Sequence, residues 1–278
     1  MRWSPRVRAR GDRRIVPSGA ALPYLFVRYV AIGDSFTEGV GDPQPGGGVR
    51  GWADLVAIGL ASAHGSVEYA NLAIRGRLIE PIATVQCDAA LALDPRPDVM
   101  TFNGSGNDMM RPGWDAARIS ALMQRVVDLT GEAGVSLVVL SGPDPTERLP
   151  RGRTFSERAD ELMAIVEGLE AAHDHVTFVD NYRDAEMRRA AYWDTDRLHL
   201  NPLGHSRVAA RVLAAMGVET DLPVAPAGDP GRPGVIEEAA YVGRYVLPWI
   251  GRRLTGRSSG DGRVPKHPAW TTIEAPVG

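Results

Sequence analysis

Residues 30–39 read Val-Ala-Ile-Gly-Asp-Ser-Phe-Thr-Glu-Gly, and the fold prediction starts from this stretch. The apolar run 27–32 is typical of a buried strand, and it stops at a Gly-Asp-Ser turn. Ser35 therefore follows a strand at the edge where open α/β sheets bind their ligands. Taken alone, the tripeptide favours a helix cap at Asp34 or Ser35 over a nucleophile.

Expected strands and helices alternate regularly along the chain after residue 27. The expected strands are 27–32, 67–72, 99–103, 136–140 and 176–179. The expected helices are 51–63, 77–93, 114–132 and 156–172, and a last helix runs from Pro202 to about Met216. This order predicts βαβ units. The predicted fold class is therefore α/β, a three-layer α/β/α sandwich around a central, mostly parallel five-stranded sheet.

A second chemical signal lies far from the first, where Asp196 and His199 are three residues apart. A serine hydroxyl is a poor nucleophile until a base takes its proton, and that base needs a third group to orient it. One turn of chain would let the Asp196 carboxylate reach the His199 imidazole. Two further polar segments, 71–77 and 104–108, each follow an expected strand. Both would reach the same edge of the sheet.

These four segments, in this order, resemble the SGNH hydrolases, the superfamily that includes the GDSL esterases and lipases. The resemblance extends from about residue 27 to about residue 216 and implies the flavodoxin-like fold of that superfamily. It also implies a catalytic triad and an oxyanion hole. The implied triad is Ser35 as nucleophile, Asp196 as orienting acid and His199 as base. The implied oxyanion hole is Ser35, Gly76 and Asn107.

The match to the family pattern is inexact in the third block and leaves two candidates for the acid. The third family block usually reads Gly-x-Asn-Asp, but Ser105 takes the place of its glycine here. Asp194 competes with Asp196 for the role of the acid, and the three-residue spacing to His199, with the family pattern, favours Asp196. Asp34 is expected to organise the turn before Ser35 through backbone hydrogen bonds.

Composition narrows the range of partners. The formal net charge is −3 over 278 residues, which gives no case for nucleic acid as a partner. The single cysteine, Cys87, excludes an internal disulfide. The glycines at 46–48 lack the spacing of a phosphate-binding loop, and His199 and His205 lack a third ligand for zinc. We therefore expect neither a cofactor nor a metal.

The two ends of the chain are expected to be appendages of one hydrolase domain over 27–217. Residues 1–26 are rich in arginine and lack the apolar core of a signal peptide, which predicts a disordered leader or a start codon assigned too early. Residues 218–278 are expected to form a Pro/Gly linker, an amphipathic arm over 235–254 and a polar tail from 255. With no signal peptide or transmembrane helix recognised, the expected location is cytoplasmic.

The resulting hypothesis is a serine esterase that hydrolyses a small carboxylic ester, such as a short-acyl or acetyl ester, through an acyl-enzyme. The apolar side of the arm is expected to pack on the domain or on a second subunit. Arginines beside Trp249 and Ile250 also permit contact with a membrane surface, so a lysophospholipase or lipase is the alternative. A third hypothesis is a non-catalytic binding protein on the same scaffold.

Overall fold

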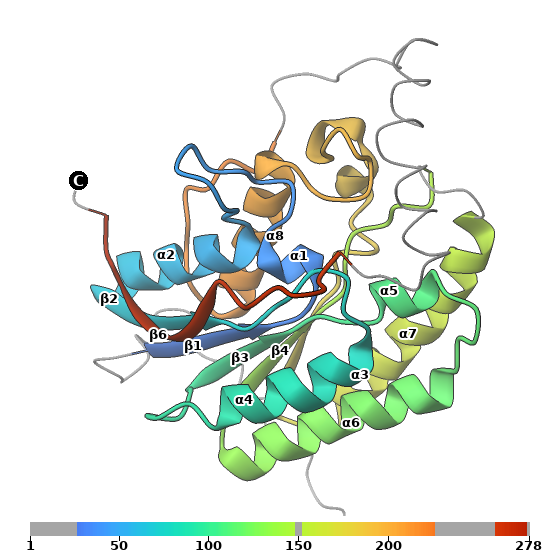
Figure 1. The fold of residues 1–278 in the computed structure, drawn as a ribbon, viewed down its shortest axis with the longest axis horizontal. Helices are drawn as coiled ribbons and strands as arrows, with labels where there is room; N and C mark the ends of the chain where they lie inside the picture. Colours follow the sequence, from blue (N-terminus) through green and yellow to red (C-terminus); the bar gives the residue numbers. More distant parts are fainter. Residues whose placement is uncertain (1–26, 148–151, 226–258, 277–278) are drawn as a thin grey trace, which may run out of the picture.

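The computed structural model describes residues 27–147, 152–225 and 259–276 (Figure 1). The leader expected over 1–26 and the amphipathic arm expected over 235–254 lie outside the described residues.

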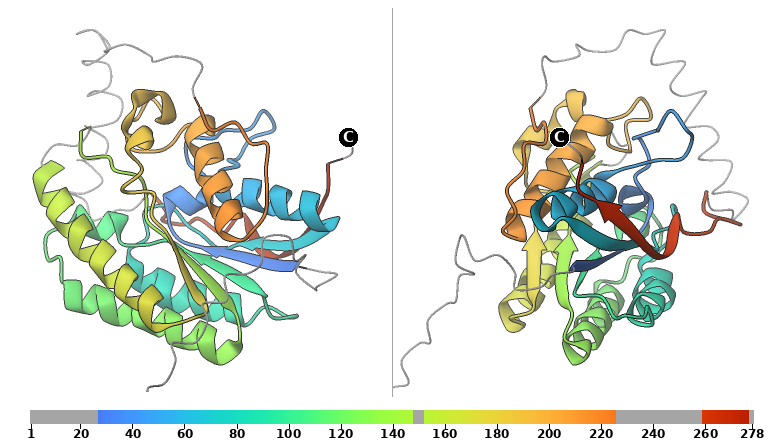
Figure 2. Two further views of the ribbon diagram at one scale, coloured as in Figure 1. Left: turned by 180° about the vertical axis from the view of Figure 1, so that it is seen from behind. Right: turned by 90° about the vertical axis from the view of Figure 1, so that its left-hand side faces the viewer.

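A single sheet of six strands forms the centre of the described part, in the order β5-β4-β3-β1-β2-β6. β1 to β5 are parallel to their neighbours, whereas β6 is antiparallel to β2 (Figure 2). The strands are β1 (Val27–Ile32), β2 (Ser66–Asn71), β3 (Val99–Phe102), β4 (Ser136–Leu140), β5 (Val176–Val179) and β6 (His267–Glu274). The mostly parallel sheet is confirmed.

The sixth strand corrects two predictions, the count of five strands and the polar tail from residue 255. β6 pairs with β2 from Ser66 opposite Glu274 to Asn71 opposite His267. Its residues are all exposed or half-buried, so it lacks the continuous apolar run that marks a strand inside a parallel sheet. An edge strand needs only one backbone partner, and that partner lies about 200 residues earlier, so local sequence does not reveal it.

Helices cover both faces of the sheet, as predicted (Figure 1). One face carries α2 (Trp52–His64) and α8 (Pro202–Ala215), which pack against each other. The other face carries α6 (Ala116–Ala133), α7 (Gly152–Ala172) and the segment expected as one helix over 77–93. That segment is α3 (Ile79–Pro81), a π-helical turn (Ile82–Gln86) and α4 (Cys87–Leu91). Two short helices, α1 (Ser35–Glu38) and α5 (Gly106–Met109), follow β1 and β3.

β1 is central because alternate side chains belong to two different apolar layers. Val30 and Ile32 pack in the layer under α4, α6 and α7, whereas Tyr29 and Ala31 pack in the layer under α2 and α8. All four are fully buried. Burial of apolar area is the main favourable term in folding, so the strand that ends just before Ser35 is anchored on both faces.

Candidate active site

Ser35 is the first residue of α1 and follows directly on the turn after β1. Asp34 caps this helix, because its Oδ1 accepts a hydrogen bond from the Phe36 backbone N–H at 3.1 Å. The expectation that Asp34 organises the turn is confirmed. Ser35 itself is half-buried.

A side chain that the sequence did not single out holds the other end of this turn. Gln86, in the π-helical turn, accepts from the Gly33 backbone N–H at 2.8 Å and donates to the Gly33 carbonyl oxygen at 3.0 Å. The two groups are buried and 53 positions apart. No spacing rule predicts such a contact, because it depends on how α3 and α4 pack on β1.

Asn107 lies in α5, at the carboxyl end of β3. Its side-chain amide donates to Asp34 Oδ2 and to the Arg77 carbonyl oxygen, both at 3.0 Å. The structure therefore brings Asn107 to the Gly-Asp-Ser turn and to the loop that contains Gly76. Gly76 has a left-handed φ of 75°, which glycine adopts without strain.

Ser105, which stands where the family pattern has glycine, adopts a backbone conformation that favours glycine. Its φ is 76°, in the left-handed region that non-glycine residues rarely enter. Its Oγ is buried and has no hydrogen-bond partner among the described residues. The departure from the family pattern is therefore accommodated in the backbone path, at the cost of local strain.

The loop after β2 is tied to α1 by an ion pair between Glu38 and Arg75. The Glu38 carboxylate accepts from the Arg75 backbone N–H at 2.7 Å and from its guanidinium at 2.5 to 3.0 Å. This bidentate geometry holds Arg75, the residue before Gly76, against the helix that begins at Ser35. The Glu38 carboxylate is thus engaged by Arg75.

Asp196 and His199 form the predicted pair in the loop before α8. Asp196 Oδ2 is hydrogen-bonded to His199 Nδ1, and Asp196 Oδ1 accepts from the His199 backbone N–H at 2.9 Å. Burial raises the pKa of Asp196, but the hydrogen bonds from His199 outweigh it, so this pKa lies below its ordinary value. The competing Asp194 carboxylate instead accepts from the Thr195 N–H at 2.7 Å.

The loop that contains His199 packs directly on the loop that follows α1. A Cβ atom on Gly41 would lie 1.9 Å from the Leu200 carbonyl oxygen and 3.4 Å from His199 Cβ. His205 reinforces this contact, because its Nε2 donates to the Val40 carbonyl oxygen at 3.1 Å. Ser35 and His199 therefore lie at the same end of the sheet, although none of the described hydrogen bonds joins them. Catalytic hydrogen bonds are often long or poorly aligned before a substrate binds.

The Asp34 carboxyl is buried, and this burial raises its pKa to about 6. The hydrogen bond from Phe36 and the nearby charge of His199 act in the opposite direction. Within residues 27–147, 152–225 and 259–276, no three His, Cys, Asp or Glu side chains are grouped to hold a metal ion. In the same ranges, none of the helices has the length and apolar character that crossing a bilayer requires.

The fold and this arrangement of side chains define an SGNH-type hydrolase. The model of the GDSL-like lipase/acylhydrolase family matches residues 31–207, which is more than half of the chain. The chain therefore belongs to the GDSL-like lipase/acylhydrolase family. Its predicted site residues Ser35, Gly76, Asn107, Asp196 and His199 all lie within the matched residues.

Several solved structures share the fold, and two of the three described here are named esterases. Axe2, an acetylxylan esterase from Geobacillus stearothermophilus, has 21% sequence identity and a TM-score of 0.54, with 69% of this chain and 95% of that chain covered. The psychrotrophic esterase EstA from Pseudoalteromonas sp. has 16% identity and a TM-score of 0.53, with coverage of 68% and 96%. TesA has 17% identity and a TM-score of 0.55, with coverage of 68% and 97%. None of the curated protein sequences compared with the chain matches it.

Proposed function

We propose that the protein is a serine esterase that hydrolyses a small carboxylic ester through an acyl-enzyme on Ser35. Membership of an acylhydrolase family supports the reaction class. The observation that carries the proposal is the hydrogen bond between His199 Nδ1 and Asp196 Oδ2. A carboxylate on Nδ1 selects the tautomer whose Nε2 is unprotonated, and this nitrogen is the base that a serine nucleophile needs.

In the proposed first step, His199 Nε2 takes the Ser35 hydroxyl proton as Oγ attacks the ester carbonyl carbon. Asp196 stabilises the imidazolium that forms. The low pKa of Asp196 supports this role, because the carboxylate stays ionised at neutral pH. His199 then donates its proton to the leaving alcohol, and a water molecule activated by the same imidazole releases the acid from Ser35.

The oxyanion of the tetrahedral intermediate would be held by the backbone N–H groups of Ser35 and Gly76 and by the Asn107 amide. The position of Ser35 at a helix start favours negative charge there. The Asn107 amide already has two internal acceptors, so it must share one of these hydrogens with the oxyanion. Donors that are fixed before the reaction begins lower the barrier without reorganising.

For the substrate we propose a short-acyl ester such as an acetyl ester. One structure of the same fold is named an acetylxylan esterase and another an esterase, which makes acetyl esters the first compounds to test. The acid and the alcohol of the substrate define separate parts of the pocket, so a series that varies the acyl chain isolates the first of them.

The test compares hydrolysis of p-nitrophenyl acetate, butyrate and octanoate by the wild type and by Ser35→Ala. We expect turnover by the wild type that decreases with chain length, and no turnover above background by the variant. A fluorophosphonate should label the wild type at Ser35 and leave the variant unlabelled. Equal activity of the two proteins would refute the nucleophile, and a preference for octanoate would refute the short-acyl substrate.

A further inference from the structure

The C-terminal segment 259–276 lies outside the residues that match the family model, yet it reaches the candidate active site. β6 is antiparallel to β2, and its first residue, His267, lies opposite Asn71, the last residue of β2. Because β6 runs in the opposite direction, its start lies at the edge where the parallel strands end (Figure 2). Lys266, directly before β6, therefore lies near the segments that follow β1 and β2.

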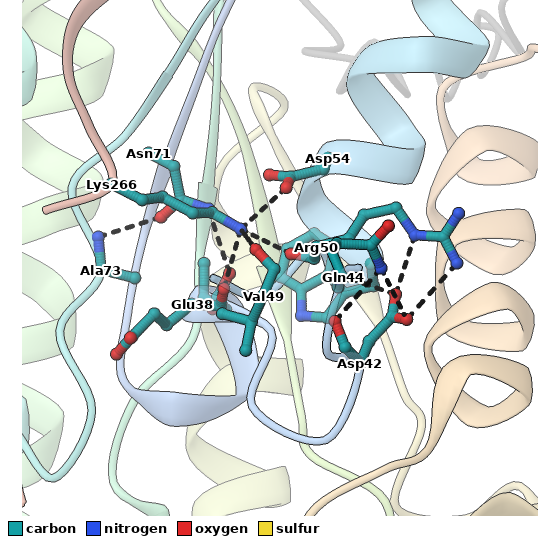
Figure 3. Close-up of polar contacts among 12 residues, drawn as sticks. Glu38, Asp42, Gln44, Val49, Arg50, Asp54, Asn71, Ala73 and Lys266 are labelled. Atoms are coloured by element: carbon teal, nitrogen blue, oxygen red, sulfur yellow. Dashed lines mark hydrogen bonds and ion pairs between the residues drawn. The ribbon is translucent and has the colours of Figure 1, made fainter. Parts of the chain in front are cut away.

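Lys266 binds the backbone where two elements of the site meet (Figure 3). Its Nζ donates to the carbonyl oxygens of Glu38 at 2.7 Å and Arg50 at 2.5 Å, and a longer contact of 3.4 Å reaches that of Val49. The ammonium also pairs with Asp54 Oδ2 at 2.9 Å. A lysine ammonium has three donors, which the two short carbonyl contacts and Asp54 use.

These carbonyl groups come together because two glycines let the chain cross itself closely. Gly39 ends α1 and Gly51 precedes α2, and a Cβ on Gly51 would lie 2.3 Å from the Gly39 Cα. Glu38 is the last residue of α1, and its carbonyl oxygen needs a partner outside the helix. The Lys266 ammonium neutralises the converging oxygens and so stabilises the crossing. Ser35 is thus the first residue of α1, and Lys266 binds the carbonyl oxygen of its last residue, Glu38.

Lys266 is the only lysine in a chain whose other 30 basic residues are arginines. An ammonium is a compact charge with three donors that point in different directions, whereas a guanidinium is a flat fork that suits two parallel acceptors. The acceptors around Lys266 come from α1, from the loop before α2 and from α2 itself. Their arrangement fits an ammonium and not a guanidinium.

A second contact joins the same segment to the loop of the predicted oxyanion hole. A Cβ on Gly260 would lie 2.1 Å from the Arg75 carbonyl oxygen and 3.0 Å from Ile74 Cγ2. The turn at Gly260 therefore packs against the backbone just before Gly76. Since Arg75 is also bound to the Glu38 carboxylate, the segment touches both partners of this ion pair.

We propose that residues 259–276 position the oxyanion hole, with Lys266 as the positioning residue for the helix that begins at Ser35 and the turn at Gly260 for the loop that contains Gly76. The proposal rests on the proposed function, because it concerns the two backbone N–H groups that would stabilise the oxyanion. Lys266 touches no reacting atom. It acts through α1, and it sets the distance and direction of the Ser35 backbone N–H relative to the oxyanion.

The test uses the full-length protein with Lys266→Met, Lys266→Arg and Gly260→Ala. Arg153→Gln is the matched control for loss of a positive charge, because Arg153 is exposed on α7. Gly168→Ala is the control for an added methyl group, because nothing lies within 4 Å of that site. Ser35 is titrated with a fluorophosphonate, and kcat is calculated per titrated site. KM and the inhibition constant of a trifluoromethyl ketone, which forms a tetrahedral adduct, are measured in parallel.

We expect Lys266→Met and Gly260→Ala to lower kcat per titrated site by about 10- to 100-fold, because a small displacement of a catalytic group has effects of that order. KM should stay within about threefold of the wild type, since the ground state uses these donors less than the transition state. Binding of the ketone should weaken in proportion to kcat/KM. Lys266→Arg should restore little of the loss, and both controls should match the wild type.

A normal kcat per site in both Lys266→Met and Gly260→Ala would overturn the proposal, even if fewer sites were titrated, because the segment would then serve stability alone. Full recovery in Lys266→Arg would overturn the argument from ammonium geometry. Failure of the proposed function is a different result: the wild type itself would then show neither ester hydrolysis nor labelling that depends on Ser35.

Discussion

The side-chain amide of Asn107 donates to the Asp34 carboxylate and to the Arg77 carbonyl oxygen, both at 3.0 Å. Asp34 precedes the predicted nucleophile, and Arg77 follows the predicted oxyanion glycine. The Asn107 amide therefore bonds to two loops, the one after β1 and the one after β2. Asn107 itself lies in α5, which follows a third strand, β3. This contact fixes the direction of the amide nitrogen before any ligand is present.

Replacing Asn107 by Ala should lower kcat by about 10²–10³, the effect typical of losing one oxyanion donor. The loss should be smaller than that in Ser35→Ala, which removes the covalent step altogether. Ester hydrolysis per fluorophosphonate-titrated site measures it. An Asn107→Ala protein that is folded and as inactive as Ser35→Ala would contradict the assigned roles.

Replacing Asp196 by Asn should lower kcat by about 10⁴ with little change in fold, because the amide stabilises the wrong tautomer of His199. The matched control is Asp194→Asn, two residues away, whose carboxylate bonds to Thr195 rather than to His199. We expect the control to retain most of its activity. If Asp194→Asn lost more activity than Asp196→Asn, the acid would be Asp194.

The buried Asp34 carboxyl should make stability depend on pH. Its pKa is about 6 in the folded protein against an ordinary value of 3.8, so the folded state binds more protons between these values. The unfolding free energy of the wild type, relative to Asp34→Asn, should therefore fall as the pH rises from 4 to 7, by on the order of 3 kcal/mol. Urea unfolding of both proteins across this range provides the measurement. A difference independent of pH would mean that Asp34 titrates normally.

Ser105→Gly should raise the unfolding free energy by about 1–2 kcal/mol. The change removes the strain of a left-handed φ and a buried hydroxyl without a described partner, which together outweigh the greater freedom of glycine in the unfolded chain. Ser105→Ala is the control, because it removes the hydroxyl and keeps the strain. Thermal unfolding should rank the proteins with Gly above Ala, and the reverse order would refute the strain.

Gln86→Leu should destabilise the protein by about 2–4 kcal/mol and lower activity as well. The variant keeps the volume of the side chain, but it leaves the buried Gly33 N–H without the acceptor it has now. Because Gly33 precedes the Asp34-Ser35 turn, a change here should also reduce kcat per titrated site. Unchanged stability would show that water or a backbone shift replaces the amide.

Local patterns in the sequence account for much of the fold. The five parallel strands and the helices between them follow from apolar runs and their spacing, because each buried strand needs a continuous apolar stretch. β6 was missed because its residues carry no such run. The helix expected over 77–93 was broader than the observed segment, since a π-helical turn leaves little trace in apolar spacing.

The candidate site likewise contains contacts that the sequence predicts and contacts that it does not. The hydrogen bond between Asp196 and His199 was predictable, because three residues of spacing keep the two side chains within one turn of chain. The contacts of Gln86 with Gly33, of Arg75 with Glu38 and of Lys266 with the end of α1 were not. Each joins polar side-chain or backbone groups at least 37 positions apart, and polar contacts of that kind have no period along the chain.

The sequence by itself determined the class of fold, the place of Ser35 at the end of a buried parallel strand and the pairing of Asp196 with His199. Short-range hydrogen bonds and the spacing of apolar residues indicate these features, and both can be recognised from residues close together in the sequence. Only the tertiary structure decided that Asn107 meets Asp34, and that the C-terminal segment pairs with β2 and places Lys266 at the end of α1. Those contacts exist because packing of the sheet and helices brings distant polar groups together where water is excluded, so each group needs a partner.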